Sequence, residues 1–252
     1  MKPPPLALSA AALAALVGVA LWRRWRGGRR TVRTPLPPPP DTGPSAVPIA
    51  SSAAELATHV RSEGVCLIES VLDRGALAEL EGALNALEPR KLQNRRKHRW
   101  EHVHSPEAAP YVQLASQPQI AAAVRALLGP KTYLEKAGML VSHPGAEAQR
   151  WHMDTPHLFT VGAHLPPHSL SVFVPLVDLT PANGPTEFQL GTHVKANLVA
   201  PQRHALACCP AGSLVVYDIR VMHRGGPNVS DAKRPVVYLT FSRVWYRDTL
   251  NP

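Results

Sequence analysis

The chain has 252 residues, 45% of them hydrophobic, and a formal net charge of +9. This length suits one catalytic domain with an appendage and allows a sizeable buried core. The charge is unevenly distributed, because residues 1–34 contain seven basic side chains and no acidic one, which leaves +2 for the other 218 residues. The nearly neutral body gives no support to a nucleic-acid-binding function, and we expect no nucleic-acid partner.

The three cysteines, Cys66, Cys208 and Cys209, are too few and too irregularly spaced for a disulfide framework. The sequence contains no C-x-x-C pair, which argues against a zinc site built on cysteine. This usage is typical of buried or free thiols in a reducing compartment.

An apolar segment occupies residues 6–22, contains no charged side chain, and is followed by six arginines within residues 23–33. As a helix, its 17 residues would rise about 26 Å, slightly less than the ~30 Å hydrocarbon core of a bilayer. Residues 1–33 are therefore predicted as a single-pass membrane anchor with a basic flank. A cleaved targeting peptide is the alternative, because no acidic residue precedes Asp41, as is typical of organelle transit peptides. An anchor with this flank would leave the rest of the chain in the cytoplasm, and a cleaved peptide would deliver it to an organelle.

Residues 34–49 are rich in proline and predict a stiff tether without packing of its own. Residues 50–252 have the composition of a globular domain. The spacing of apolar residues predicts helices over residues 53–62, 73–87 and 117–128, and strands over residues 64–72, 133–143, 169–179, 212–223 and 235–245. Helices followed by short strands predict a mainly β fold with flanking helices, either an antiparallel barrel or a sandwich.

His152, Asp154 and His223 form a pattern that can bind a metal ion. In an extended chain residues i and i+2 point to the same face, so His152 and Asp154 can share one ion. His223 lies 69 residues after Asp154, at the end of an apolar strand, and can reach the same ion from a neighbouring strand. Two imidazoles and one carboxylate form the facial triad that holds iron(II) in oxygenases and leaves positions open for substrate and O2. We therefore predict these three residues as metal ligands and as the catalytic centre.

Arg234 follows His223 by 11 residues, across the tight turn expected at residues 225–228. A hairpin of this length would bring the guanidinium close to the metal. An arginine in that position can hold a carboxylate with two parallel hydrogen bonds, as the distal end of a 2-oxoglutarate cosubstrate requires.

Three segments together resemble the phytanoyl-CoA dioxygenase family: HxD at residues 152–154, NGPTEFQLGTH at 183–193, and HRGGPN at 223–228 with the arginine that follows it. The resemblance is strongest over residues 150–243. It implies a double-stranded β-helix (jelly-roll) core, iron(II) on the predicted triad, and 2-oxoglutarate and O2 as cosubstrates, with Arg234 on the distal carboxylate. It also implies that Met139 and Phe173 lie on strands that line the cosubstrate pocket. The substrate does not follow from the family, and we expect a small organic or lipid-like molecule that becomes hydroxylated.

Two other functions stay open at this point. A zinc-dependent hydrolase on a barrel fold would recruit His157 or His168 as an extra ligand, and a membrane-tethered binding protein would keep the fold without turnover. Otherwise His157, His164 and His168 are expected on a loop over the mouth of the active site. The basic residues 90–99 predict a solvated face or a lid for an anionic substrate. Glu187 is expected to hold its own loop, and the oligomeric state stays open.

Overall fold

The computed structural model describes residues 44–96, 98–159, 164–194 and 203–249. Its helices are α2 (Ala53–Glu63), α3 (Arg74–Asn85), α4 (Ala109–Ala115) and α5 (Pro118–Leu128). Its strands are β1 (Ser45–Ala46), β2 (Val65–Ile68), β3 (Lys91–Arg96), β4 (Arg99–His104), β5 (Thr132–Ser142), β6 (Ser169–Pro175), β7 (Thr186–Gln189), β8 (His204–Leu206), β9 (Leu214–Asp218), β10 (His223–Gly225) and β11 (Arg234–Arg243). The apolar helix predicted at residues 6–22 lies outside these ranges. Within them, no helix is both long and apolar enough to cross a membrane.

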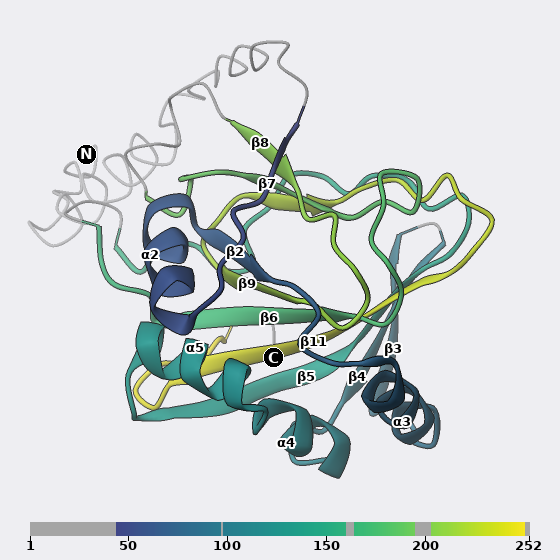
Figure 1. Ribbon diagram of the computed structural model, residues 1–252, viewed down its shortest axis with the longest axis horizontal. Helices are drawn as coiled ribbons and strands as arrows, with labels where there is room; N and C mark the ends of the chain where they lie inside the picture. Colours follow the sequence, from purple (N-terminus) through teal and green to yellow (C-terminus); the bar gives the residue numbers. More distant parts are fainter. Residues whose placement is uncertain (1–43, 97, 160–163, 195–202, 250–252) are drawn as a thin grey trace, which may run out of the picture. The chain divides into compact units, whose positions relative to one another are not determined.

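The strands form two sheets, one in the order β1-β8-β7-β10 and a larger one in the order β2-β9-β6-β11-β5-β4-β3 (Figure 1). Except for the parallel pair of β1 and β8, the paired strands run antiparallel. Apolar side chains from both sheets form one core, which includes Phe173 and Val215 from the large sheet and Phe188 and Ala205 from the small sheet. The structure therefore confirms the predicted mainly β fold, as two sheets packed face to face in the manner of a jelly roll.

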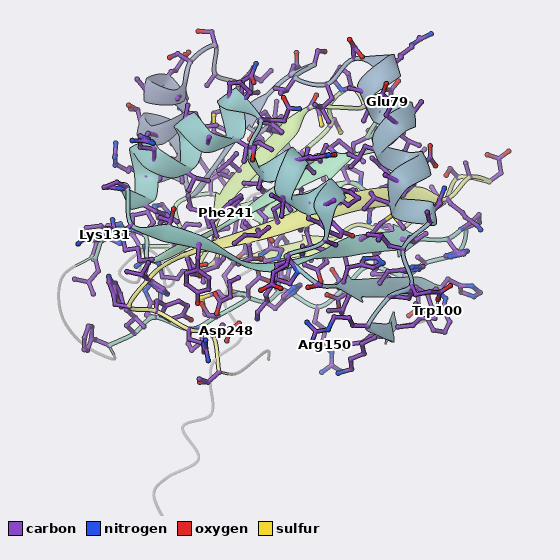
Figure 2. All side chains as sticks on the ribbon, turned by 90° about the horizontal axis from the view of Figure 1, so that it is seen from below. Glu79, Trp100, Lys131, Arg150, Phe241 and Asp248 are labelled. Carbon is purple, nitrogen blue, oxygen red and sulfur yellow. The ribbon has the colours of Figure 1, made fainter. Side chains whose placement is uncertain are left out.

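The helices cover the opposite face of the large sheet. Leu56 of α2 and Ile120 of α5 pack in a second core with Val172 and Leu239 of the sheet. Figure 2 shows the helices on one side of the sheet and the labelled Arg150 and Asp248 on the other. Successive strand residues point to opposite faces, so each central strand of the large sheet contributes to both cores. The face directed at the small sheet also lines the space in which a site can form.

The predicted helices match α2, α3 and α5 within a few residues. Two of the starts are capped by side chains: that of Ser52 caps α2, and Asp73 Oδ1 accepts a 2.9 Å hydrogen bond from the Ala76 N–H at the start of α3. The third helix, α5, begins at Pro118 without a side-chain cap. Gly129, with a φ of 80°, and Pro130 follow the last residue of α5 and end the helix.

The strand predicted over residues 212–223 is divided in the structure. β9 ends at Asp218, and His223 begins β10 of the other sheet instead of ending β9. The buried pair Asp218–Arg220 explains the break, because Asp218 Oδ1 accepts hydrogen bonds from the Arg220 backbone N–H at 3.0 Å and from Arg220 Nε at 2.8 Å. A side chain that bonds its own backbone two residues on favours a turn over a continuous strand.

Two further segments differ from the prediction. The end of the predicted tether is part of the fold, because Ser45 and Ala46 pair with β8 and Val47 is buried in the core between the sheets. The basic region that was not assigned an element contains β3 and the beginning of β4. Both segments lack the alternation of polar and apolar residues on which the strand prediction relied.

Candidate active site

A short backbone pairing brings the three predicted ligands together. His152 and His223 form an isolated antiparallel bridge, with backbone N–H to O distances of 3.0 Å and 2.8 Å in the two directions. The Asp154 N–H donates a 3.0 Å hydrogen bond to the carbonyl of Ile219, in the turn after β9. The segment His152–Asp154 is thus held by a backbone hydrogen bond to the turn that Asp218 and Arg220 form.

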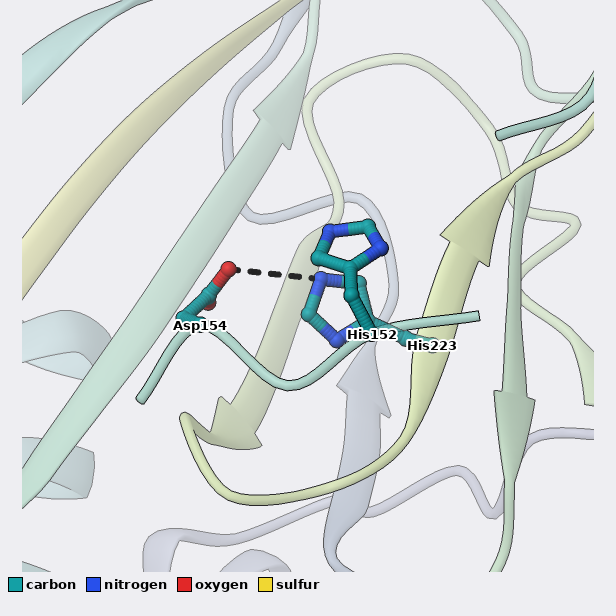
Figure 3. Close-up of side chains that lie close together, drawn as sticks. All are labelled: His152, Asp154 and His223. Atoms are coloured by element: carbon teal, nitrogen blue, oxygen red, sulfur yellow. Dashed lines mark ion pairs between the residues drawn. The ribbon is translucent and has the colours of Figure 1, made fainter. Parts of the chain in front are cut away.

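The ligand-capable atoms of His152, Asp154 and His223 all lie within 4.8 Å of one another (Figure 3). His223 Nε2 is 3.5 Å from Asp154 Oδ1. In each histidine the other ring nitrogen, Nδ1, contacts a backbone carbonyl: that of Arg150 at 2.8 Å for His152, and that of Val221 at 3.0 Å for His223. A carbonyl can only accept, so Nδ1 carries the proton and the Nε2 lone pair of each neutral ring is available to a metal.

Burial and hydrogen bonding also set the protonation of the site. Burial lowers the pKa of His223, against the opposite influence of Asp154, and so favours the neutral form that binds a metal. The Tyr217 hydroxyl donates a 3.0 Å hydrogen bond to Asp154 Oδ2, and burial followed by the Asp154 charge raises the pKa of Tyr217 well above its ordinary value. Tyr217 therefore stays a donor and leaves Oδ1 directed at His223. The sequence does not reveal this role, because an inward-facing tyrosine on an apolar strand such as β9 has the pattern of an ordinary core residue.

The three ligands line a cavity of about 750 Å³ between the two sheets. The large sheet supplies most of the wall, from Phe173 and Ser171 of β6, Tyr238 and Thr240 of β11, Leu140 of β5, and Glu101 and Val103 of β4. A cavity of this size accommodates a cosubstrate and a further small molecule.

Two buried arginines lie in this cavity. Arg234 begins β11 and Arg99 begins β4, and both are paired with Ser142 of β5, from its two sides. They are 3% and 2% exposed, and the Nε atom of each is buried without a hydrogen-bond partner. Burial lowers the pKa of Arg99 to about 10, and burial together with the Arg99 charge lowers the pKa of Arg234 to about 9. Both groups stay cationic at neutral pH, in a position suited to a carboxylate.

Arg234 is where the sequence predicted it, whereas Arg99 was predicted only as part of the basic residues 90–99, as a solvated face or a lid for an anionic substrate. Arg99 Nη2 donates a 2.8 Å hydrogen bond to the carbonyl of Gly226, so this arginine also contacts the turn after His223. The sequence alone does not single out Arg99, because it is one of several basic residues in the same stretch. Only the pairing of β4 with β5 shows that its side chain is the one buried in the cavity.

The turn between His223 and Arg234 is held by buried contacts. Asn228 Nδ2 donates to the carbonyls of Ser142 at 3.0 Å and Ala232 at 2.9 Å, which fixes the hairpin to β5 where Arg234 begins β11. Gly184 has a φ of +73°, and a Cβ there would lie 2.5 Å from the carbonyl oxygens of Gly226 and Pro227. The NGP and HRGGPN segments thus pack directly against each other, which explains the glycine.

The two residues that the family resemblance placed at the pocket separate in the structure. Phe173 lines the cavity. Met139 does not belong to its lining, because β11 pairs it with Val237, whose side chain packs in the core facing the helices, while the neighbouring Leu140 lines the cavity. Met139 thus lies on a strand that lines the cavity, as expected, but the expectation that Met139 itself contacts the cosubstrate is wrong, because a shift of one residue along a strand exchanges the two faces.

The remaining predicted polar residues lie outside the metal group. Among the described residues, the group of ligand atoms that could hold a metal ion contains none of His157, His164 and His168. His168 is buried against the ring of Tyr246, with 4.3 Å between ring centroids. In the basic stretch, Arg90 and Lys91 line the cavity as part of its wall.

Comparison with known proteins agrees with this geometry. The family model described as phytanoyl-CoA dioxygenase (PhyH) matches residues 60–236. A curated relative, "Dioxygenase easH" of Epichloe festucae var. lolii, is 30% identical over 92 residues, which are 34% of this chain and 50% of the relative. The match therefore spans only half the length of that relative.

Solved structures share the fold at low sequence identity. The epimerase SnoN in complex with Fe3+, alpha ketoglutarate and nogalamycin RO has a TM-score of 0.64 and 21% identity, over 79% of this chain and 87% of that one. EctD from S. alaskensis with 2-oxoglutarate and 5-hydroxyectoine has a TM-score of 0.65 and 19% identity, over 83% of this chain and 87% of that one. The jelly-roll architecture is thus common to all three proteins.

Proposed function

The chain belongs to the phytanoyl-CoA dioxygenase family, and from this premise we propose that it is an iron(II)- and 2-oxoglutarate-dependent dioxygenase that hydroxylates a small molecule. The observation that carries the proposal is the group of His152, Asp154 and His223, with both histidine Nε2 atoms available, in one cavity with two buried arginines. Borderline nitrogen and hard oxygen donors in this ratio suit iron(II) with open coordination positions. When bound, iron(II) with 2-oxoglutarate and O2 supplies the oxidising chemistry.

Each part of the cavity has a separate task in this proposal. The triad holds the metal on one wall, and Tyr217 orients the carboxylate of Asp154. Arg234, with Arg99 on the other side of β5, provides the positive charge for the distal carboxylate of 2-oxoglutarate. The buried position of both arginines excludes water from these contacts and strengthens them.

The other end of the cavity is available to the substrate. Along β11 the lining continues past Tyr238 to Thr240, and Ser169 and Ser171 of β6 lie beside it. Lys136 and Asp248 form an ion pair of 2.6 Å in the same lining. Burying an acyl chain against these groups would cost their hydration, so a polar molecule fits this end better than a lipid. The SnoN and EctD complexes likewise hold small molecules, nogalamycin RO and 5-hydroxyectoine.

The two alternatives have less support. A zinc hydrolase would use His157 or His168 as a further ligand, and neither is in the metal group of the described residues. It would also give the two buried arginines no task. A binding protein without turnover would not require a complete triad in which the Nδ1 of each histidine bonds a backbone carbonyl and leaves Nε2 available to a metal.

Membrane attachment is a proposal from the sequence alone. Residues 6–22 are apolar and the six arginines after them favour a cytoplasmic position for the oxygenase domain. This segment lies outside the described residues, and a cleaved targeting peptide stays the alternative.

The deciding experiment is an anaerobic titration of the purified domain with iron(II) and 2-oxoglutarate. We expect a weak visible charge-transfer band that requires both components, and succinate formation after O2 is admitted. Absence of the band together with zinc-dependent hydrolysis of ester probes would overturn the proposal. Hydroxylation is then tested by mass spectrometry, as the gain of one oxygen atom in a polar substrate.

A further inference from the structure

The two ligand histidines lie on backbone segments that have little regular secondary structure. β10 has three residues, and His152 belongs to no strand, only to the bridge with His223. The bridge itself consists of two backbone hydrogen bonds, flanked by one from the Gln149 N–H to the Gly225 carbonyl at 2.9 Å and one from the Asp154 N–H to the Ile219 carbonyl at 3.0 Å. So short a pairing has low local stability on its own. Side-chain contacts on the other face of this pairing add to these backbone bonds in keeping the two ligand histidines in register.

Four side chains on the outer face of this pairing meet in a closed arrangement. Trp151 and Arg224 are the chain neighbours of His152 and His223, and the Arg224 guanidinium lies 4.5 Å from the centre of the Trp151 ring. Arg224 Nε donates a 2.6 Å hydrogen bond to Glu187 Oε2. His204 contacts Glu187 Oε1 through Nδ1 at 2.9 Å, and its ring lies edge-on to Trp151 with 5.0 Å between centroids.

Strand geometry explains why this arrangement acts on the ligands. Arg224 is the direct cross-strand partner of Glu187, and Phe188, which follows Glu187, is the partner of His223. Successive residues point to opposite faces, so Trp151 and Arg224 hold the outside of the same two segments whose inside presents His152 and His223. The Glu187 side chain is 12% exposed and bonds both His204 and Arg224. These contacts are therefore less weakened by water than an ion pair on the open surface.

We propose that Trp151, Glu187, Arg224 and His204 form an outer brace that locks the register of the His152 and His223 segments and thereby positions the metal ligands. None of the four is a metal ligand, and the brace acts through the backbone that it holds. The inference goes beyond the proposed dioxygenase activity, although its effect on metal binding rests on that proposal.

The test uses the full domain with Arg224→Gln, Glu187→Gln and the double variant. Glu63→Gln is the matched control, because Glu63 also forms an ion pair with an arginine, Arg203, outside the cavity. The first measurement is hydrogen–deuterium exchange of the metal-free protein. Faster exchange of the peptides spanning residues 150–155 and 221–226, and not in the control, is expected. Unchanged exchange of these peptides would overturn the proposed brace. Because the protein is metal-free, this result does not depend on whether the metal assignment is right.

The second measurement is Mn(II) affinity, with Mn(II) as a redox-stable substitute for iron(II), together with its EPR spectrum. Groups that hydrogen-bond metal ligands typically contribute about 10- to 100-fold in affinity. Since the brace acts one step further out, through the backbone, we expect a loss of about 10-fold or less in both single variants, and an altered spectrum. The double variant should be no weaker than the singles, because the residues act as a unit. Arg224→Lys should restore part of the affinity. Additive losses, or affinities that merely follow the unfolding temperature, would contradict the proposal.

Discussion

The Tyr217 hydroxyl donates a 3.0 Å hydrogen bond to Asp154 Oδ2, while Oδ1 of the same carboxylate lies 3.5 Å from His223 Nε2. One oxygen of Asp154 is therefore committed to the protein, which directs the other at the metal position. Through this hydrogen bond an aromatic residue of the core sets the geometry of the candidate metal site.

Tyr217→Phe removes this hydrogen bond and keeps the ring that packs against Phe173 and Phe188. We expect metal affinity to fall about 10- to 100-fold with little change in the unfolding temperature. Calorimetric titration with Mn(II) measures the first, and thermal unfolding the second. Tyr133→Phe is the control, since its hydroxyl donates to the carbonyl of Tyr246 outside the cavity lining. Equal effects of the two variants would contradict the role of Tyr217.

His152→Ala and His223→Ala should each abolish tight metal binding and 2-oxoglutarate turnover, because two remaining ligands cannot hold the ion at one face. The charge-transfer titration and succinate formation report the two losses. His164→Ala serves as the control, since His164 is exposed and outside the cavity lining. Succinate formation at the level of the unaltered protein in either ligand variant would disprove the assignment.

Arg234→Lys keeps a positive charge and loses the planar pair of donors. Hydrogen bonds to charged groups contribute about 1.5–3 kcal/mol, so the apparent KM for 2-oxoglutarate should rise about 10- to 100-fold while Mn(II) affinity without cosubstrate stays constant. Arg243→Lys is the control, because Arg243 Nε donates to the carbonyl of Pro167, away from the cavity. If only the Arg243 variant raised this KM, the cosubstrate would bind elsewhere.

Gly184→Ala should destabilise the protein, because the added Cβ would lie 2.5 Å from two backbone carbonyl oxygens at a φ of +73°. Gly82→Ala is the opposite case, since nothing lies within 4 Å of its Cβ in α3, and helix propensity predicts a gain of about 0.5–1 kcal/mol. Urea unfolding of both variants checks the signs. A neutral Gly184→Ala would mean that the two turn segments separate easily.

Membrane attachment is tested by protease protection of the expressed full chain in sealed vesicles. If residues 6–22 form an anchor, the domain after Pro48 should be digested without detergent, since the basic flank favours the cytoplasmic side. Full protection would reverse the orientation. Recovery of a soluble chain without about the first 30 residues would establish a cleaved targeting peptide instead.

Local chemistry was readable from the sequence. The caps Ser52 and Asp73 and the apolar spacing of α2, α3 and α5 act within a few residues, so these helices were predictable. The spacing of His152 and Asp154 and the apolar strand before His223 also predicted the triad that the structure brings together. A pattern of two residues does not depend on the rest of the fold.

Only the tertiary structure decided which face each strand presents and which segments meet. The register of β11 against β5 excludes Met139 from the cavity and admits Leu140, and the pairing of β4 buries Arg99 beside Arg234. Tyr217 reaches Asp154 only because a turn at Asp218–Arg220 passes the chain from one sheet to the other. Such contacts join residues that are distant in the chain, and their choice depends on the packing of two sheets as a whole.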